Sequence, residues 1–236
     1  MHMATVAEQE QEDHVSANRW LLMFLTGLPL EVHNPVRRFP WAVTGLIAVN
    51  VLVYVVELLV TPQSVLRFSF VPSEFRRLIG VHHIVSAMFM HANLIHLLGN
   101  LYFLYTFGDN VEDFLGPLGF LALYFVGGIL AHLTYFVSNI YSTAHMVGAS
   151  GAISAVFAAY MLLYPRRRIY FLVIIWPMKV RAVWYGLGWI ALQIFLSLAS
   201  TAHIAWWDHI GGFAAGLVLI GSYLKYKHLQ SPAGPV

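Results

Sequence analysis

Six stretches of the chain are apolar over nearly the length that a membrane-spanning helix needs, and this pattern leaves few possible folds. A helix crosses the roughly 30 Å hydrocarbon core with about 20 residues. Of the residues, 59% are hydrophobic and only 10% are charged, against about a quarter charged in soluble domains. The sequence therefore predicts an all-α membrane protein whose six transmembrane helices lie at Phe39–Val60, Met90–Phe107, Leu118–Val137, Gly151–Tyr164, Val183–Ser200 and His209–Leu224.

The basic residues fall unevenly on the two sides of these spans. If the N-terminus is cytosolic, ten of the thirteen Lys and Arg residues face the cytosol, among them Arg166–Arg168, and three face outside. An excess of Lys and Arg marks the cytoplasmic side. Both termini are therefore predicted to be cytoplasmic, in a prokaryotic cell (inner) membrane. The loop after the first span is then external, and its length favours a functional role over a simple tether.

The remaining segments suggest a division into three parts. Residues 1–38 are expected to form a cytosolic segment with a short interfacial helix at Trp20–Leu30, which is too short to span and lacks the basic region of a signal peptide. Residues 39–227 form the six-helix domain, and residues 228–236 a cytosolic tail. Ile169–Trp176 also falls short of a span and is expected to be extended or re-entrant. With no cysteine, disulfides and thiolate chemistry are excluded.

Sequence spacing places a serine and a histidine at one depth. Sixteen residues separate Ser150 from Arg166, and sixteen separate His209 from Lys225, so each polar residue lies about 24 Å from its cytosolic marker. Both are then submerged below the outer surface, where polar groups must be buried in protein or line a water-filled cavity. Intramembrane ionisable residues are candidates for function.

The second span adds two more polar residues near that depth. His96 lies sixteen residues before Glu112, and Asn100 lies one helical turn deeper. A histidine can activate a serine hydroxyl by taking its proton. Because Ser150 begins a helix, free backbone N–H groups lie beside it, and His96 and Asn100 can donate further hydrogen bonds to an oxyanion.

Small residues indicate that the helices carrying Ser150 and His209 approach closely. Gly151, Ala155 and Ala159 form one small face, and Gly212 and Gly216 form a GxxxG pattern three residues after His209. Small faces let membrane helices pack at short distance.

The ordered motifs resemble those of the rhomboid family of intramembrane serine proteases. They are HANLIHLLGN, which contains His91, His96 and Asn100; FGDNVEDFLG; GASG, residues 148–151; and WWDHIGGFAAG, which contains His209. The resemblance implies a six-helix bundle with a partly immersed first loop. It implies Ser150 as nucleophile, His209 as general base and acid, His96 and Asn100 in the oxyanion hole, and Gly148, Gly151, Gly212 and Gly216 in support.

Three positions depart from the family pattern. His82 and His83 stand where Trp-Arg is frequent, so the usual attachment of the first loop is in doubt. Asp208 precedes His209 in place of alanine; neighbouring helical residues face about 100° apart, so Asp208 is expected to cap the sixth helix instead of orienting the histidine. Ser154 stands where some members place an aromatic residue on the histidine ring.

Other polar and aromatic residues are interpreted as structural. His91 is expected to tie down the external loop, and His132, His145 and His203 to be interface or loop residues. Glu57 is expected to reach interfacial water. The set Trp184, Tyr185 and Trp189 is interpreted as an interfacial aromatic belt.

The sequence therefore predicts a serine endopeptidase that hydrolyses peptide bonds in or near transmembrane segments with a Ser-His dyad. It needs no cofactor or metal, its partners are transmembrane protein substrates and the lipid bilayer, and no nucleic acid is involved. The alternative is a catalytically inactive rhomboid-like protein that binds transmembrane segments. A metal site of His91, His96 and His209 is a further reading, disfavoured because no HExxH motif is present.

Overall fold

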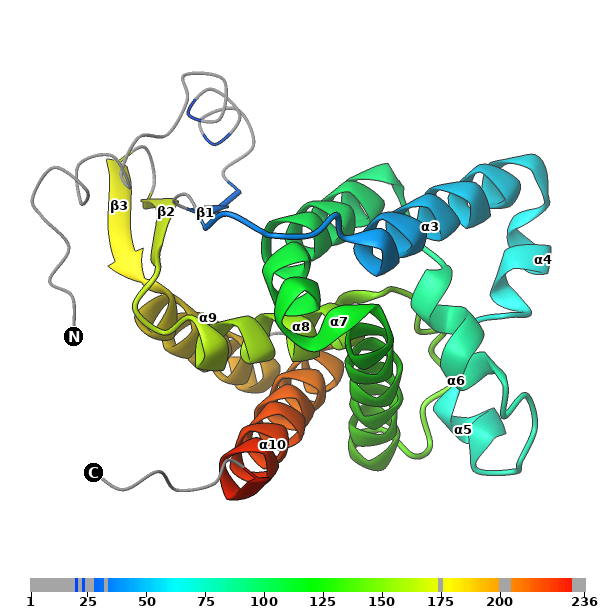
Figure 1. Cartoon of the computed structure of the whole chain (residues 1–236). Helices are drawn as coiled ribbons and strands as arrows, with labels where there is room; N and C mark the ends of the chain where they lie inside the picture. The colour runs from blue at the N-terminus through cyan, green and yellow to red at the C-terminus, as the bar shows by residue number, and fades with distance from the viewer. Residues whose placement is uncertain are drawn as a thin grey trace, which may run out of the picture.

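The chain is mostly helical. The computed structural model describes Trp20, Met23 and residues 28–31, 34–173, 176–199 and 205–230. Its longer helices are α3 (Trp41–Leu59), α7 (Leu94–Ser138), α8 (Ser150–Leu163), α9 (Ala182–Ala199) and α10 (Trp206–Gln230) (Figure 1). Within these described ranges, α3, α7 and α9 are long and apolar enough to cross a membrane, and α8 is a shorter apolar helix.

The longest element, α7, consists of two helices joined at a kink. Gly116 has φ 73° and ψ 165°, and Pro117 restarts the helix, as expected of a proline in the first turn. The two parts correspond to the predicted runs Met90–Phe107 and Leu118–Val137. The first part continues beyond its predicted end through the polar residues 109–113.

A carboxylate near this kink holds the start of α3. Glu112 is 3% exposed. Its two oxygens accept the backbone N–H groups of Ala42, at 2.9 Å, and Val43, at 2.8 Å. The first N–H groups of a helix have no partner within the helix, and Pro40, which precedes α3, provides no side-chain cap. Glu112 therefore supplies the cap from another helix and joins the first predicted span to the second.

Helix α8 lies at the centre of the fold. Every residue from Gly151 to Met161 is buried, and α7, α9 and α10 all contact this helix. A helix that is apolar on all sides is stable only when it is enclosed. The central position places Ser150, the first residue of α8, at one end of the enclosed core.

The long connection between α3 and α7 is folded into short helices. These are α4 (Pro62–Leu66), α5 (Pro72–Phe75), α6 (His83–Ser86) and the 3-10 helix η1 (Ala87–Phe89). Phe70 and Met146 exchange two backbone hydrogen bonds of 3.0 and 2.9 Å, and Gly148 donates its N–H to the Ala87 carbonyl at 2.9 Å. These bonds hold the segment that leads into Ser150, so they attach the loop although His82 and His83 replace the frequent Trp-Arg pair.

A small antiparallel sheet lies at the opposite end of α8. Its strands are β1 (Leu30–Glu31), β2 (Arg168–Val173) and β3 (Trp176–Arg181), in the order β1-β2-β3 (Figure 1). The extended conformation predicted for Ile169–Trp176 is thus confirmed where it is described. Glu31 is buried and accepts a hydrogen bond from the Tyr160 hydroxyl of α8.

The predicted interfacial helix at Trp20–Leu30 is wrong at its end, because Leu30 pairs with Tyr170 as part of the sheet. Apart from Trp20, Met23 and residues 28–30, that segment lies outside the described residues, as does the tail from residue 231 onward. The three-part division at residues 38 and 227 stays a prediction.

Removing the Glu112 carboxylate leaves two buried backbone N–H groups without an acceptor. We expect Glu112→Ala to lower the free energy of unfolding by about 2 kcal/mol or more, measured by thermal or denaturant unfolding in detergent micelles. The matched control is Asp113→Ala, which removes one exposed hydrogen bond to the Arg38 N–H and should cost under about 0.5 kcal/mol. Equal losses in the two variants would contradict the capping role.

Candidate active site

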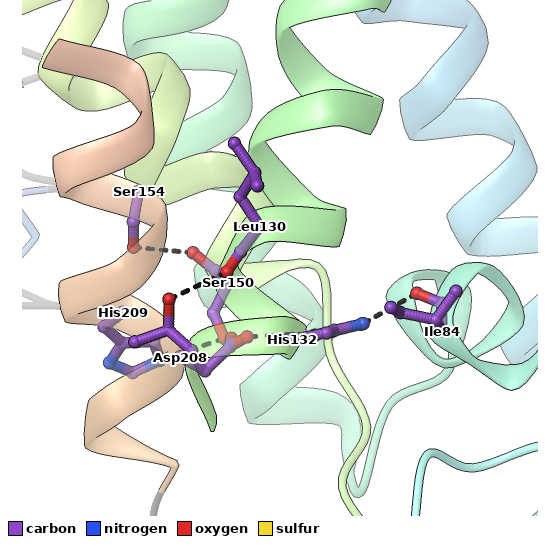
Figure 2. A network of polar contacts seen from close by, with 8 residues as sticks. Ile84, Leu130, His132, Ser150, Ser154, Asp208 and His209 are labelled. Atoms are coloured by element: carbon purple, nitrogen blue, oxygen red, sulfur yellow. Dashed lines mark hydrogen bonds and ion pairs between the residues drawn. The ribbon is translucent and has the colours of Figure 1, made fainter. Parts of the chain in front are cut away.

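Ser150 and His209 meet at the N-terminal ends of α8 and α10. Ser150 is the first residue of α8, and His209 lies in the first turn of α10. Their side chains are joined by a hydrogen bond of 2.9 Å between Ser150 Oγ and His209 Nε2 (Figure 2). Both residues are half-buried. The depths calculated from sequence spacing agree with this contact, since the two residues lie level.

Glycines bring the backbones of these two helices into contact. A Cβ atom on Gly212 would lie 2.0 Å from the Gly151 carbonyl oxygen, and one on Gly216 would lie 2.2 Å from the Ala155 carbonyl oxygen. Any larger residue at either position would push α10 away from α8. Because Gly212 and Gly216 have no side chain, the two helices lie close enough for His209 to reach Ser150.

Gly148 makes room for His96 beside the serine. It has a φ of 131°, a conformation that residues with a side chain rarely adopt. A Cβ atom there would lie 2.7 Å from His96 Cε1, 2.9 Å from His96 Nε2 and 3.6 Å from Ser150 Oγ. The imidazole of His96 and the serine hydroxyl therefore converge on one point.

Asn100 lies one helical turn after His96 on α7. It is 7% exposed, and within the described part of the chain its Nδ2 group has no hydrogen-bond partner. An unsatisfied buried donor is costly and is unusual unless it serves a site. His96, Asn100 and the first N–H groups of α8 are three kinds of donor suited to a developing negative charge.

His91 packs its ring against the His96 ring. Its ring is buried and meets the His96 ring edge-on, with centroids 5.3 Å apart. Its backbone N–H lies 3.3 Å from both carboxylate oxygens of Glu57 on α3. Glu57, which was expected to reach interfacial water, therefore also contacts the segment that leads into α7.

Two tryptophans contact the His209 ring, whereas some family members place an aromatic residue at position 154 against it. The centroids of Trp189 and Trp206 both lie 6.1 Å from the imidazole centroid. Ser154 instead donates its hydroxyl to the Ser150 carbonyl at 2.7 Å. The predicted belt is therefore wrong for Trp189, which is half-buried and packs on Phe213, whereas Trp184 is 63% exposed.

Gln193 of α9 is a site residue that the sequence analysis missed. It is 6% exposed, and its Oε1 lies 2.8 Å from His209 Nδ1. The sequence did carry a signal, because Gln193 is a polar residue in the middle of the apolar run Val183–Ser200. Polar residues within a span face the protein interior and are candidates for function.

Asp208 is paired with His132 of α7. Its Oδ1 lies 3.8 Å from His132 Nε2, and His132 Nδ1 lies 2.7 Å from the Ile84 carbonyl oxygen (Figure 2). Asp208 occupies the first turn of α10, with its carboxylate against Gly151. His132 is 1% exposed, so its assignment to an interface or loop is wrong. His145 contacts Ser69 in the first loop, and His203 lies outside the described residues.

No cluster of three or more His, Asp or Glu residues that could hold a metal ion is found in the described part of the chain.

Comparison with known proteins shows which family this chain belongs to. A family model described as the Rhomboid domain matches residues 79–226, which is more than half of the chain and includes Ser150, His209, His96, Asn100 and Gln193. The chain belongs to the rhomboid family. The match begins within the first loop and ends within α10, and so contains the motifs on which the resemblance was based.

Individual rhomboid relatives are distant. The human presenilin-associated rhomboid-like protein, mitochondrial, is 27% identical over 79% of this chain and 48% of its own length. The chloroplastic Rhomboid-like protein 11 of Arabidopsis thaliana is 32% identical over 61% of the chain and 53% of its own length. The chain thus spans about half the length of these curated relatives. Their names refer to mitochondria and chloroplasts, which conflicts with the expected prokaryotic membrane.

The contact of α10 with α8 can be tested with two glycines of α10. We expect Gly212→Ala to destabilise the protein by about 1–3 kcal/mol through overpacking, measured as unfolding in micelles. A Cβ on Gly221 has no described atom within 4 Å. Gly221→Ala should therefore be neutral or gain up to about 1 kcal/mol from helix propensity. Similar effects of the two substitutions would argue against a special contact at Gly212.

Proposed function

We propose that this rhomboid protein is an intramembrane serine endopeptidase that cleaves transmembrane segments of other proteins. The observation that carries the proposal is the 2.9 Å hydrogen bond between Ser150 Oγ and His209 Nε2, which lies beside the N-terminal end of a helix. A nucleophile bonded to a base beside a group of hydrogen-bond donors is the arrangement required for acyl transfer.

The reaction follows from these positions. His209 Nε2 accepts the Ser150 proton as Oγ attacks the carbonyl carbon of the scissile peptide bond. The imidazolium then gives this proton to the leaving nitrogen as the C–N bond breaks, and an acyl-enzyme ester remains. A water molecule, deprotonated by His209, attacks the ester and releases Ser150. No cofactor enters this sequence of steps.

Charge on the carbonyl oxygen is stabilised by donors on two helices. In this proposal the donors are Asn100 Nδ2, the His96 ring and the first backbone N–H groups of α8. The helix dipole of α8 adds positive potential at the same end. Removing one donor of this kind typically costs a factor of about 10²–10³ in kcat.

The proposed topology has six spans. The two parts of α7, together with α3, α8, α9 and α10, supply them, and both termini then lie on one side of the membrane. The site opens on the other side, where the first loop packs against the segment before Ser150. Bilayer lipids and transmembrane substrates are the expected partners. A substrate helix must unwind at the cut, because a peptide carbonyl within a regular helix is shielded from attack.

Substitution of either member of the dyad tests the proposal. We expect Ser150→Ala and His209→Ala to lower cleavage of a model transmembrane substrate by about 10⁴-fold or more, measured with purified protein in proteoliposomes. The controls are Ser197→Ala, since Ser197 bonds to Ile194 within α9, and His228→Ala at the end of α10. Undiminished cleavage in the dyad variants would refute the assignment.

Labelling of Ser150 distinguishes the peptidase from the alternative, an inactive rhomboid-like protein that binds transmembrane segments. A reactive Ser150 is expected to be modified by a fluorophosphonate probe in the wild type and not in Ser150→Ala. Absence of labelling under conditions that label an active relative, together with retained binding of a transmembrane peptide, would favour the binding protein.

The oxyanion role predicts a second kinetic signature. Asn100→Ala should lower kcat by about 10²–10³-fold with little change in KM, because the lost hydrogen bond forms only with the charged oxygen. Asn139→Ala, at the C-terminal end of α7, removes a bond to the Tyr135 carbonyl and serves as the control. A change confined to KM would indicate a role in substrate binding instead.

A further inference from the structure

Helix α9 is attached to the bundle along a narrow stripe. Of its eighteen residues, all of them described, three are buried: Ala182, Gly186 and Gln193. These positions lie on one helical face, because spacings of four and eleven residues are close to whole turns. The first two are small and allow close packing, with Gly186 facing Met161 of α8. The stripe ends at a polar residue.

The contact between Gln193 and His209 determines which ring nitrogen carries the proton. A carbonyl oxygen such as Gln193 Oε1 only accepts, so the 2.8 Å contact requires a proton on His209 Nδ1. In a neutral ring Nε2 then carries none, and it accepts the hydrogen bond from Ser150. This is the form of histidine that can act as a general base toward the serine.

We propose that Gln193 is the positioning residue of His209, and that it makes alignment of the dyad depend on the docking of α9 against α8 and α10. The inference rests on the proposed function of the dyad. Gln193 occupies the place that a carboxylate has in a Ser-His-Asp triad, and an amide fills the same place in Cys-His-Asn proteases.

The chain has a carboxylate next to His209, but that carboxylate is used elsewhere. Asp208 faces His132 and Gly151, and the amide comes from α9 instead. An amide orients the ring without placing a charge in a water-poor site, where an ion would carry a large desolvation cost. The residue that orients the His209 ring thus lies on α9, a helix with only three buried residues.

A second contact from α9 would be lost together with the first. Trp189 lies one helical turn before Gln193, and its ring packs near the imidazole. If α9 moves away from α10, His209 loses its Nδ1 acceptor and one of the two tryptophan rings beside it, while Trp206 of α10 stays. The dyad is then aligned only while α9 is docked.

The tautomer of His209 gives a readout that a merely structural residue would not change. We expect ¹⁵N NMR of histidine-labelled wild type in bicelles, assigned with His209→Ala, to show a protonated Nδ1 and an unprotonated Nε2. Gln193→Met, which keeps the length and removes the acceptor, should mix the tautomers. It should also slow fluorophosphonate labelling of Ser150 by about 10- to 100-fold, by analogy with the loss of a partner that orients a metal-bound histidine.

Three further variants complete the test. Gln193→Leu repeats the loss with another side chain in case Gln193→Met does not fold. Gln193→Glu keeps an acceptor oxygen and should restore labelling to within about tenfold of the wild type. Leu192→Ala, at a neighbouring residue that is 51% exposed, should leave both readouts unchanged.

The dependence on the packing of α9 against α8 can be tested without altering Gln193, Ser150 or His209. A Cβ on Gly186 would lie 2.5 Å from Met161 Sδ, so Gly186→Leu should push α9 outward, mix the His209 tautomers and slow labelling. Adding Met161→Ala makes room and should reverse both effects.

The outcomes separate this inference from the proposed function. Unchanged tautomer and labelling rate in a folded Gln193→Met or Gln193→Leu variant would overturn the positioning role while leaving the dyad intact. A slow Gly186→Leu variant that Met161→Ala does not rescue would overturn the dependence on docking. A wild type that neither labels nor cleaves would refute the proposed function, and the tautomer would still report whether Gln193 holds the ring.

Discussion

The contact between the backbones of α8 and α10 is the constraint on which the site depends. Gly212 and Gly216 lie so close to α8 carbonyl oxygens that even a methyl group does not fit. This spacing sets the 2.9 Å bond between Ser150 and His209. Membrane helices gain little from hydrophobic burial against one another, so close packing of small residues supplies much of their association. Packing and chemistry therefore share the same residues.

Three polar side chains inside this apolar chain contact another helix, and each contact fixes one relation in the fold. Glu112 joins α7 to the start of α3, Asp208 faces His132 between α10 and α7, and Gln193 joins α9 to α10. A bilayer offers no water to satisfy such groups, so each must find a partner within the protein. The polar residues thus specify which helices are neighbours, while the apolar residues make up most of the packed core.

Particular residues show where sequence reasoning succeeded and where it stopped. The helices follow from apolar length, and the level of Ser150 with His209 follows from the rise per residue. Contacts between segments distant in sequence were missed. The predictions of an interfacial belt for Trp189 and of an interface or loop position for His132 are wrong, because the direction of a side chain around a helix depends on its neighbours. Leu30 was assigned to a helix because its strand partner, Tyr170, is 140 positions away.

Composition and spacing within one segment are enough to predict the class of protein, the helical segments, the small faces that allow close approach and the motifs of the rhomboid family. The surroundings of His209, in contrast, depend on how the helices pack. Asp208, adjacent in sequence, faces His132, whereas Gln193, sixteen residues earlier, contacts the ring. The physical reason is that neighbouring residues on a helix point about 100° apart, so the partner of a side chain is set by helix packing and not by chain order.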